Sequence, residues 1–317
     1  MSIWRRNEAW IGLAAIDSLV FVLLGLLHPS FFSSFNIFVL LNTIALSTMI
    51  ALGQMVVIAV GQMNLSLGSI GGLAAVIFAG AMQTIGLPPV LAVLLALCLG
   101  LVCGLINGFF TARIGISAFI VTLATFAAYK GINLGLTAAQ PLYGIPASVK
   151  LAGSASVIGP VPWLLVPSLV ITLLVWFVLA RLPLGRQILA VGGNRQASEL
   201  AGVSPNRIVI LTHALSGVIA AAAGIMAVAR LQVGQPTIGD DWLIPSFTAP
   251  IIGGAVLSGG RVSVAGTVCG VILVSLITQA LVVFRVDPYY VQFALGCMIL
   301  CAVGANRLRM GRRLGAG

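Results

Sequence analysis

The stretch Arg181–Arg207 reads RLPLGRQILAVGGNRQASELAGVSPNR, and it is the longest polar interruption of an otherwise apolar chain. Asn194 is a residue type that caps helices, so a helix of about two turns is predicted over residues 195–201. Gly202 is the residue type that ends helices in the left-handed conformation. Ser204–Pro205 then predicts a new helix, with serine as its cap and proline in its first turn. The stretch therefore predicts a short water-exposed helix between two membrane spans.

The composition of the whole chain is that of a membrane protein. Of its 317 residues, 60% are hydrophobic and only 7% are charged, and the mean hydropathy is +1.16. Soluble domains carry about 25% charged residues. Long unbroken apolar runs and 37 glycines favour packed helices over a β-barrel. We therefore predict an all-α polytopic membrane protein, with a single transmembrane domain over residues 1–317.

Apolar runs of about 15 to 25 residues predict ten spans. They lie near residues 10–27, 36–59, 66–83, 88–112, 117–138, 163–180, 207–230, 244–257, 263–284 and 289–305. The eighth run is too short to cross alone and contains Pro245, Pro250 and two adjacent glycines, which predicts a broken or re-entrant helix. Residues 139–162 are rich in proline, glycine and serine and lack periodicity, so a surface loop is expected there.

The basic residues predict the orientation. With the N-terminus inside, 12 of the 16 lie at inner ends of spans, and the other four are Lys130, Lys150, Arg230 and Arg285. Both termini and the 181–207 loop are therefore expected in the cytoplasm. Five spans precede the central outer loop and five follow it, a count that predicts a five-plus-five inverted repeat. The positive charge follows span ends rather than aromatic-flanked patches, so no nucleic-acid partner is expected.

Signals for catalysis are missing. The chain has no HExxH, GxSxG or GxxxxGK[ST] motif, so it is not expected to be an enzyme or to hydrolyse nucleotides itself. The five cysteines lie inside apolar runs without CxxC spacing, which predicts packing roles and neither disulfides nor a metal site. No cofactor is expected in this chain. His213 is expected to pack or to form a hydrogen bond.

Polar and small residues recur at helical spacing inside the apolar runs. One polar stripe holds Thr122, Thr125, Tyr129 and Asn133, and another holds Thr43, Ser47 and Gln54. Such stripes must face protein or water, so they either line a solute pathway or join helices through hydrogen bonds. Glycines repeat in the sets 100/104/108, 131/135 and 266/270, which predicts close helix packing within the chain or in a dimer.

Charged residues are scarce in the spans. Asp17 is the only one securely placed at mid-membrane, with Lys130 as a second candidate. An ion-coupled carrier usually needs buried carboxylates at its centre. A neutral, hydroxyl-rich cargo is therefore favoured, and an ion-coupled secondary carrier of a small polar solute remains the alternative. In the outer loop 230–242, Asp240 and Asp241 are expected either to meet a soluble partner or to be simply solvated.

Several motifs together resemble one family. Their positions are Gly61–Ser69 (GQMNLSLGS, similar to G-G-x-D-L-S-x-G-S), Val121–Leu123 with Gly131 and Gln140–Pro141, Gly192–Gly202 (G-G-N-x-x-A-x-x-x-x-G), Gln235–Thr237, and Gly253–Gly254 with Leu257–Arg261. They resemble the membrane permeases of bacterial ABC importers for ribose, related sugars and autoinducer-like molecules. Gln62 replaces a usual glycine and Asn64 a usual aspartate.

The resemblance implies a type II-like importer permease of the bacterial inner membrane. Two permease subunits, identical or different, would form the pathway for a sugar or sugar-like neutral solute. Two cytoplasmic ATPase subunits would bind ATP and Mg²⁺, and an extracytoplasmic solute-binding protein would deliver the cargo. Gly192, Gly193, Asn194, Glu199, Ala201 and Gly202 would couple to the ATPase. Asn64 and Ser66 would join the two polar stripes along the pathway.

Overall fold

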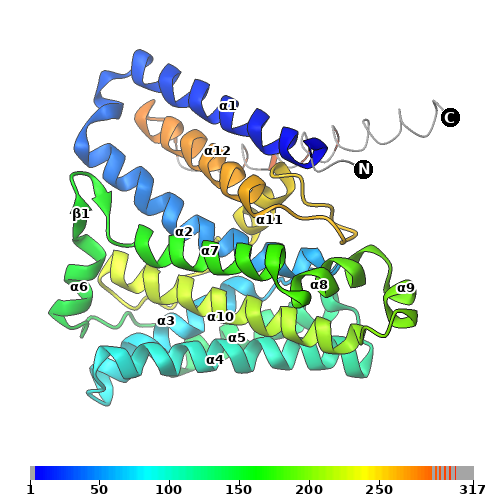
Figure 1. Ribbon diagram of the computed structural model, residues 1–317. Coiled ribbons are helices and arrows are strands. Elements are labelled where there is room, and N and C mark those ends of the chain that lie inside the picture. Colours follow the sequence, from blue (N-terminus) through cyan, green and yellow to red (C-terminus); the bar gives the residue numbers. More distant parts are fainter. Residues whose placement is uncertain are drawn as a thin grey trace.

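The computed structural model describes the backbone of residues 4–287 and of six further positions, 290, 293, 296, 297, 300 and 304. The predicted tenth span falls almost entirely outside these described residues. Figure 1 shows a bundle of long helices that run nearly side by side. The predicted all-α architecture is confirmed for this part of the chain, apart from one small hairpin.

The helices follow the apolar runs of the sequence. They are α1 (Trp4–Leu27), the 3₁₀ helix η1 (Pro29–Phe32), α2 (Ser34–Ala59), α3 (Leu67–Thr84), α4 (Pro89–Phe109), the π-helical η2 (Phe110–Ile114), α5 (Ala118–Thr137), α6 (Ala147–Ser154), α7 (Leu165–Arg181), α8 (Pro183–Gly193), α9 (Arg195–Leu200), α10 (Pro205–Leu231), α11 (Leu243–Ile252) and α12 (Val264–Val283). The hairpin pairs β1 (Ser156–Ile158) with β2 (Val161–Pro162) in antiparallel fashion.

Seven helices of the described chain are long and apolar enough to cross a membrane. They are α1, α2, α3, α4 with η2, α5, α10 and α12. The predicted sixth span is α7, which is followed after a bend of 73° by α8. The predicted eighth span is α11, only 10 residues long with Pro250 inside it, so the expectation that this run is too short to cross alone is confirmed.

Two groups of helices pack on opposite sides of α2. One group holds α3, α4, α5 and α10, with α10 in contact with α2, α3 and α4. The other holds α1, α11 and α12, with α11 and α12 both in contact with α2. The main core lies within the first group, where Met49, Leu52 and Met55 of α2 join a fully buried cluster with Phe78 of α3 and Ile219 of α10. In Figure 1, α9 marks one end of the bundle and the hairpin marks the other.

Glycines bring α4 and α10 into backbone contact, as predicted for the 100/104/108 repeat. Gly217 of α10 lies against Gly100 and Gly104, and a side chain on any of the three would collide with the facing helix. Gly108 lies against the backbone of Ile210. Close approach of this kind replaces hydrophobic burial as the source of helix association inside a membrane.

The other two glycine repeats behave differently from each other. Gly266 and Gly270 of α12 lie against the backbone of Gly253 and of α11, so this repeat also packs inside the chain. Gly131 and Gly135 of α5 have no described atom within 4 Å of the space that a side chain would fill. The repeat on α5 is therefore open to a neighbour outside the described chain.

The prediction of an irregular loop over 139–162 is wrong in part, because this region contains α6 and the β1–β2 hairpin. Val149 and Gly153, four residues apart, place one face of α6 against the bundle. A side chain on Gly153 would collide with the carbonyl of Ala229 in α10. Two residues are too short a pattern to reveal a helix in the sequence.

Candidate functional site

The polar stretch 181–207 folds largely as its sequence predicts. The side chain of Asn194 accepts a hydrogen bond from the backbone N–H of Ala197 at 2.9 Å and so caps α9. Gly202 has φ +80°, which confirms the left-handed stop. Ser204 holds the N-cap position of α10 but makes no side-chain capping bond. Leu200, the last residue of α9, is 91% exposed. It was not among the coupling residues that the sequence predicted.

The two glycines before α9, Gly192 and Gly193, lie in a helix rather than in a turn. They are the last residues of α8, a helix that the sequence did not predict, and the chain turns at Asn194. Gly193 does not have a left-handed φ, unlike Gly202. The apolar face of α8, with Ile188 and Val191, packs against the end of α2, and this tertiary contact stabilises the helix.

Three segments meet through four glycines, Gly61, Gly192, Gly259 and Gly260, which we call the glycine junction. A β-carbon on Gly192 would collide with the carbonyl oxygen of Ala59, and one on Gly61 would lie 2.7 Å from the carbonyl oxygen of Ser258. A β-carbon on Gly259 would lie 2.8 Å from the carbonyl oxygen of Gly192. The N–H of Gly260 donates to the carbonyl of Ala59 at 3.0 Å. The junction thus joins the ends of α2 and α8 to the 253–263 loop between α11 and α12.

Beyond Gly61 the chain continues without helical structure through residues 62–66, inside the bundle. Here four side chains form what we call the polar cluster: Asn64, Ser66, Asn107 and Ser216, all of them fully buried. Asn64 donates to the hydroxyl of Ser216 at 3.0 Å, and Ser66 donates to Asn64 at 2.8 Å. Asn107 donates to the hydroxyl of Ser66 at 2.8 Å. The polar cluster thus connects the non-helical residues 62–66 to α4 through Asn107 and to α10 through Ser216.

Gln54 secures the backbone of the same segment. With its amide oriented to satisfy both atoms, the nitrogen donates to the carbonyl of Asn64 at 3.0 Å and the oxygen accepts from the N–H of Asn64 at 3.2 Å. Buried backbone groups outside regular structure need such partners in a membrane. Gln62 lies beside the cluster, and its Oε1 is 2.9 Å from Nε2 of the buried His213, which fits the expected hydrogen-bonding role of that histidine.

The predicted stripe on α5 faces protein. Thr122 donates to the carbonyl of Ala118 at 2.7 Å, and Thr125 contacts the carbonyl of Thr122 at 3.4 Å. The Tyr129 hydroxyl donates to the carbonyl of Cys103 in α4 at 3.1 Å. Asn133 is also buried. Tyr129 therefore joins α5 to α4, whereas the two threonines bond within α5, and Thr125 is the one member of the four that is half-buried rather than buried.

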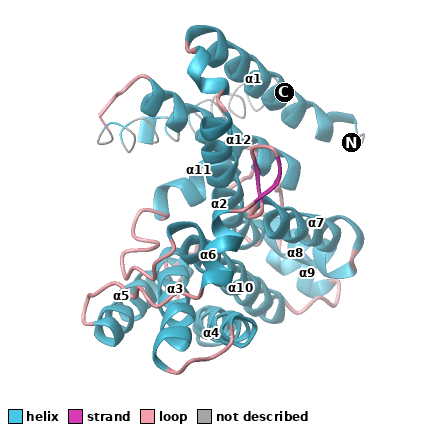
Figure 2. Ribbon diagram, turned by 90° about the vertical axis from the view of Figure 1, so that its left-hand side faces the viewer, coloured by secondary structure: helices cyan, strands magenta, loops and turns pink. Residues whose placement is uncertain are grey.

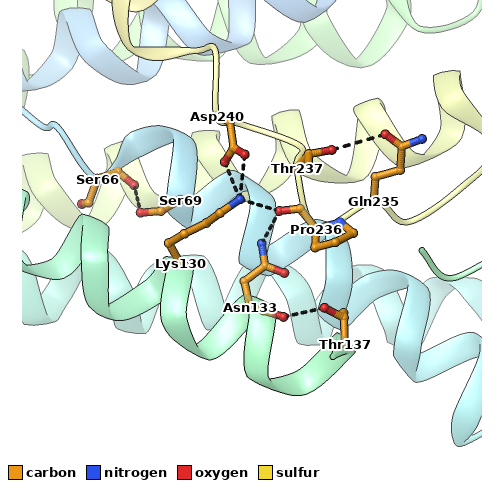
Figure 3. Close-up of polar contacts among 9 residues, drawn as sticks. All are labelled: Ser66, Ser69, Lys130, Asn133, Thr137, Gln235, Pro236, Thr237 and Asp240. Atoms are coloured by element: carbon orange, nitrogen blue, oxygen red, sulfur yellow. Dashed lines mark hydrogen bonds and ion pairs between the residues drawn. The ribbon is translucent and has the colours of Figure 1, made fainter. Parts of the chain in front are cut away.

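Residues 232–242, which we call the strap, lie between α3 and α5. Figure 3 shows Asn133 and Lys130 of α5 both donating to the carbonyl of Pro236, at 3.0 and 2.8 Å, and Lys130 pairing with Asp240. A side chain on Gly68 in α3 would collide with the carbonyl of Gly239. The strap is thus fixed at several points, and Asp240 is engaged within the chain rather than merely solvated.

The remaining predicted pathway residues lie nearer the N-terminal end of α2 than Gln54 does. Thr43 donates to the carbonyl of Val39 at 3.0 Å and accepts from Arg230 of α10 at 3.1 Å. Ser47 is half-buried one turn further on. The structure therefore brings Gln54, Asn64 and Ser66 together, whereas Thr43 and Ser47 lie apart from them.

Sequence reasoning missed the partners Asn107 and Ser216. Each sits next to a glycine of a helix-packing contact, Gly108 and Gly217, inside an apolar run. A polar residue beside such a glycine was the available signal.

The described residues thus form a helical bundle with seven span-length helices, a non-helical segment inside it between α2 and α3, and an exposed capped helix at one end, which is the architecture of a multi-pass membrane protein. The chain belongs to the family of branched-chain amino acid transport system / permease components, whose model matches residues 36–303. It is therefore the membrane-spanning permease component of a transport system.

Curated relatives cover nearly the whole chain. The chain is 32% identical to the ribose import permease protein RbsC of Bacillus subtilis over 289 residues, 90% of this chain and 89% of the relative. It is 33% identical to RbsC of Haemophilus influenzae over 294 residues, 91% and 90% of the two chains. It is 31% identical to the D-allose transport system permease protein AlsC of Escherichia coli over 296 residues, 92% and 90%. No solved structure matches the chain.

Proposed function

We propose that this chain is the permease subunit of an ABC importer that carries a sugar or sugar-like neutral solute, with ATP hydrolysed on a separate subunit. The observation that carries the proposal is the glycine junction. It links α8, which leads into the exposed helix α9, to the end of α2 and to the non-helical residues that follow it inside the bundle. Such a link is what an importer needs if nucleotide chemistry outside the membrane is to move helices inside it. The relatives named for ribose and D-allose import support the solute class.

The 181–207 segment is the proposed coupling loop. Leu200, almost fully exposed on the tip of α9, and the exposed Glu199 would dock on the ATPase, which would hold ATP and Mg²⁺. Asn194 and Ala201, at the two ends of α9, and Gly202 would fix its geometry. Gly192 and Gly193, at the end of α8, would pass the motion of α9 to the end of α2. Inward-facing and outward-facing states would then be two discrete packings of the bundle.

The proposed pathway residues fall into two groups that differ in burial: buried residues form a wall, and half-buried residues line the pathway. Gln54, Asn64, Ser66, Thr122, Tyr129 and Asn133 are buried and hydrogen-bonded within the chain, so they would hold the wall in shape. Thr43, Ser47 and Thr125 are only half-buried and would offer hydroxyls to the solute. Hydroxyl and amide groups suit a neutral cargo that can both donate and accept hydrogen bonds.

Three partners follow from this reading. A second permease subunit, identical or different, would pack on α5 where Gly131 and Gly135 are open. An extracytoplasmic solute-binding protein would meet the hairpin end of the bundle, and the ATPase would meet the α9 end. The excess of arginines at the predicted inner ends of the spans supports the proposal that both termini and α9 lie in the cytoplasm, with the chain in the inner membrane of a bacterium.

Reconstitution tests the proposal. The chain is co-purified from its native membrane, the ATPase that accompanies it is identified, and both are placed in liposomes with labelled ribose and D-allose. ATP-dependent, vanadate-sensitive uptake is expected, and a complex with a catalytically dead ATPase is the control. Uptake that needs no ATPase and follows an ion gradient would establish the secondary carrier instead.

A further inference from the structure

A cavity of about 530 Å³ lies beside the glycine junction, at the α9 end of the bundle. Three parts of the chain line it: residues 61–63 after α2, residues 111, 112 and 115–119 from η2 into α5, and Arg195 of α9. Its volume falls in the range of small-molecule sites, about 300–1,000 Å³. It lies apart from the proposed solute-lining residues Thr43, Ser47 and Thr125, none of which lines it.

The lining favours an anion. Among the described lining residues, Arg195 is the only charged one, and none is acidic. The start of α5 also faces the cavity through Ser117, Ala118 and Phe119. The first backbone N–H groups of a helix have no partner within the helix, and they carry its positive dipole end. The Ser117 side chain does not cap them.

Thr111 provides an independent indication that the cavity suits a polar ligand. It lines the cavity, is only 7% exposed, and its hydroxyl has no hydrogen-bond partner among the described residues. Other helical threonines bond back to the carbonyl four residues earlier, as Thr122 does at 2.7 Å and Thr137 at 2.9 Å. Thr111 lies in the π-helical η2, where this bond is absent, and such segments are frequent at functional sites.

We propose that this cavity binds a small phosphate-bearing anion. The guanidinium of Arg195 and the N-terminus of α5 would hold the phosphate group. One Arg195 nitrogen donates to Asn206 at 2.6 Å, which orients the side chain and leaves its other N–H groups for the ligand. The hydroxyls of Thr111 and Ser117 would bind the remaining oxygens. Free phosphate and a phosphorylated sugar share this chemistry, and the experiment separates them.

The test uses the full chain without an ATPase, in nanodiscs of zwitterionic lipid, so that no nucleotide site and no anionic headgroup competes. Ribose 5-phosphate and inorganic phosphate are titrated separately by calorimetry. Saturable binding of at least one is expected, and Arg195→Gln should weaken it about tenfold or more, as loss of a charge-assisted pair would. Tighter binding of ribose 5-phosphate identifies a phosphorylated sugar as the source, and equal binding identifies free phosphate.

Three further variants keep the result interpretable. Arg186→Gln removes the same charge from the exposed face of α8, outside the cavity, and should leave binding unchanged. Thr111→Val removes the unpartnered hydroxyl and should weaken binding by a smaller factor. Arg195→Lys keeps the charge without the planar fork and should fall between the wild type and Arg195→Gln. No binding of either compound, or full binding in folded Arg195→Gln protein, overturns the proposal. The result does not depend on whether the chain imports a sugar.

Discussion

Gly192, in the last turn of α8, touches the carbonyl oxygen of Ala59, the last residue of α2, with no room for a side chain between them. The same oxygen accepts the hydrogen bond from Gly260. Two helix ends that are more than a hundred residues apart in the sequence are therefore in direct backbone contact. Movement of α8 has to displace the end of α2 as well.

Replacement of Gly192 by alanine should uncouple ATP hydrolysis from uptake. The added β-carbon collides with backbone, which cannot move aside, and overpacking of this kind costs about 1–3 kcal/mol. Gly80→Ala in α3 is the matched control, because its β-carbon would lie 3.6 Å from the Leu142 side chain, an ordinary contact away from the glycine junction. The measured quantity is solute imported per ATP hydrolysed in liposomes. Equal ratios for the two variants would remove the glycine junction from the coupling route.

Gly202→Ala should also impair coupling, through strain rather than collision. Gly202 has φ +80° and open space around it, and a left-handed alanine costs about 1–2 kcal/mol. Gly86 has φ +70° and equally open space in the connection between α3 and α4. Gly86→Ala should therefore lose comparable stability while its import per ATP stays at the wild-type value. If both variants import normally, the geometry after α9 plays no part in transport.

Removal of the Asn64 side chain should destabilise the bundle. Asn64→Ala leaves Ser66 and Ser216 without their partner in a fully buried site, which costs about 1–3 kcal/mol of unfolding free energy. Asn36→Ala, which breaks one exposed bond to Ser30, should cost less than about 1 kcal/mol. The midpoints of thermal unfolding in detergent compare the two. A midpoint for Asn64→Ala no lower than that of Asn36→Ala would contradict the structural role of the polar cluster.

Neutralisation of Asp240 should loosen the strap. The Lys130–Asp240 pair has side chains 20% and 46% exposed, so solvent screening limits its contribution to about 0.2–1 kcal/mol. Hydrogen exchange of residues 232–242 should rise by up to about fivefold in Asp240→Asn, and less at high salt. Asp241→Asn removes the same charge from the exposed neighbour and should leave exchange unchanged. Identical exchange in both variants would show that the pair does not hold the strap.

A bulky residue on the open face of α5 should weaken self-association. Gly135→Leu fills the space that a second subunit is proposed to occupy, because nothing in the described chain lies within 4 Å of it. Gly12→Leu on α1 is the control, since that glycine is open in the same way. Mass photometry in nanodiscs should show fewer dimers for Gly135→Leu alone. Loss of dimers in the Gly12 variant instead would place the interface on α1.

The sequence predicts the long helices and the cap of α9 because these depend on neighbours within a few residues. Apolar runs set the helix lengths, and Asn194 and Gly202 act through their own backbone. The partners of Asn64 and Gln62 are 152 and 151 residues away, on the same helix α10, and no local periodicity encodes such a pairing. Helix α8 is stabilised by its contact with the end of α2, which is distant in the sequence. No local pattern encodes that contact, so the sequence did not predict this helix.

The glycine junction also determines how stiff the protein is at this point. A contact between side chains absorbs small displacements because each side chain can change rotamer. At the four junction glycines the backbone of one segment contacts the backbone of another. No side chain lies between them that could change rotamer and absorb a displacement. The ends of α2, α8 and the 253–263 loop must therefore shift as one rigid piece, and a substitution elsewhere in the bundle cannot soften that connection.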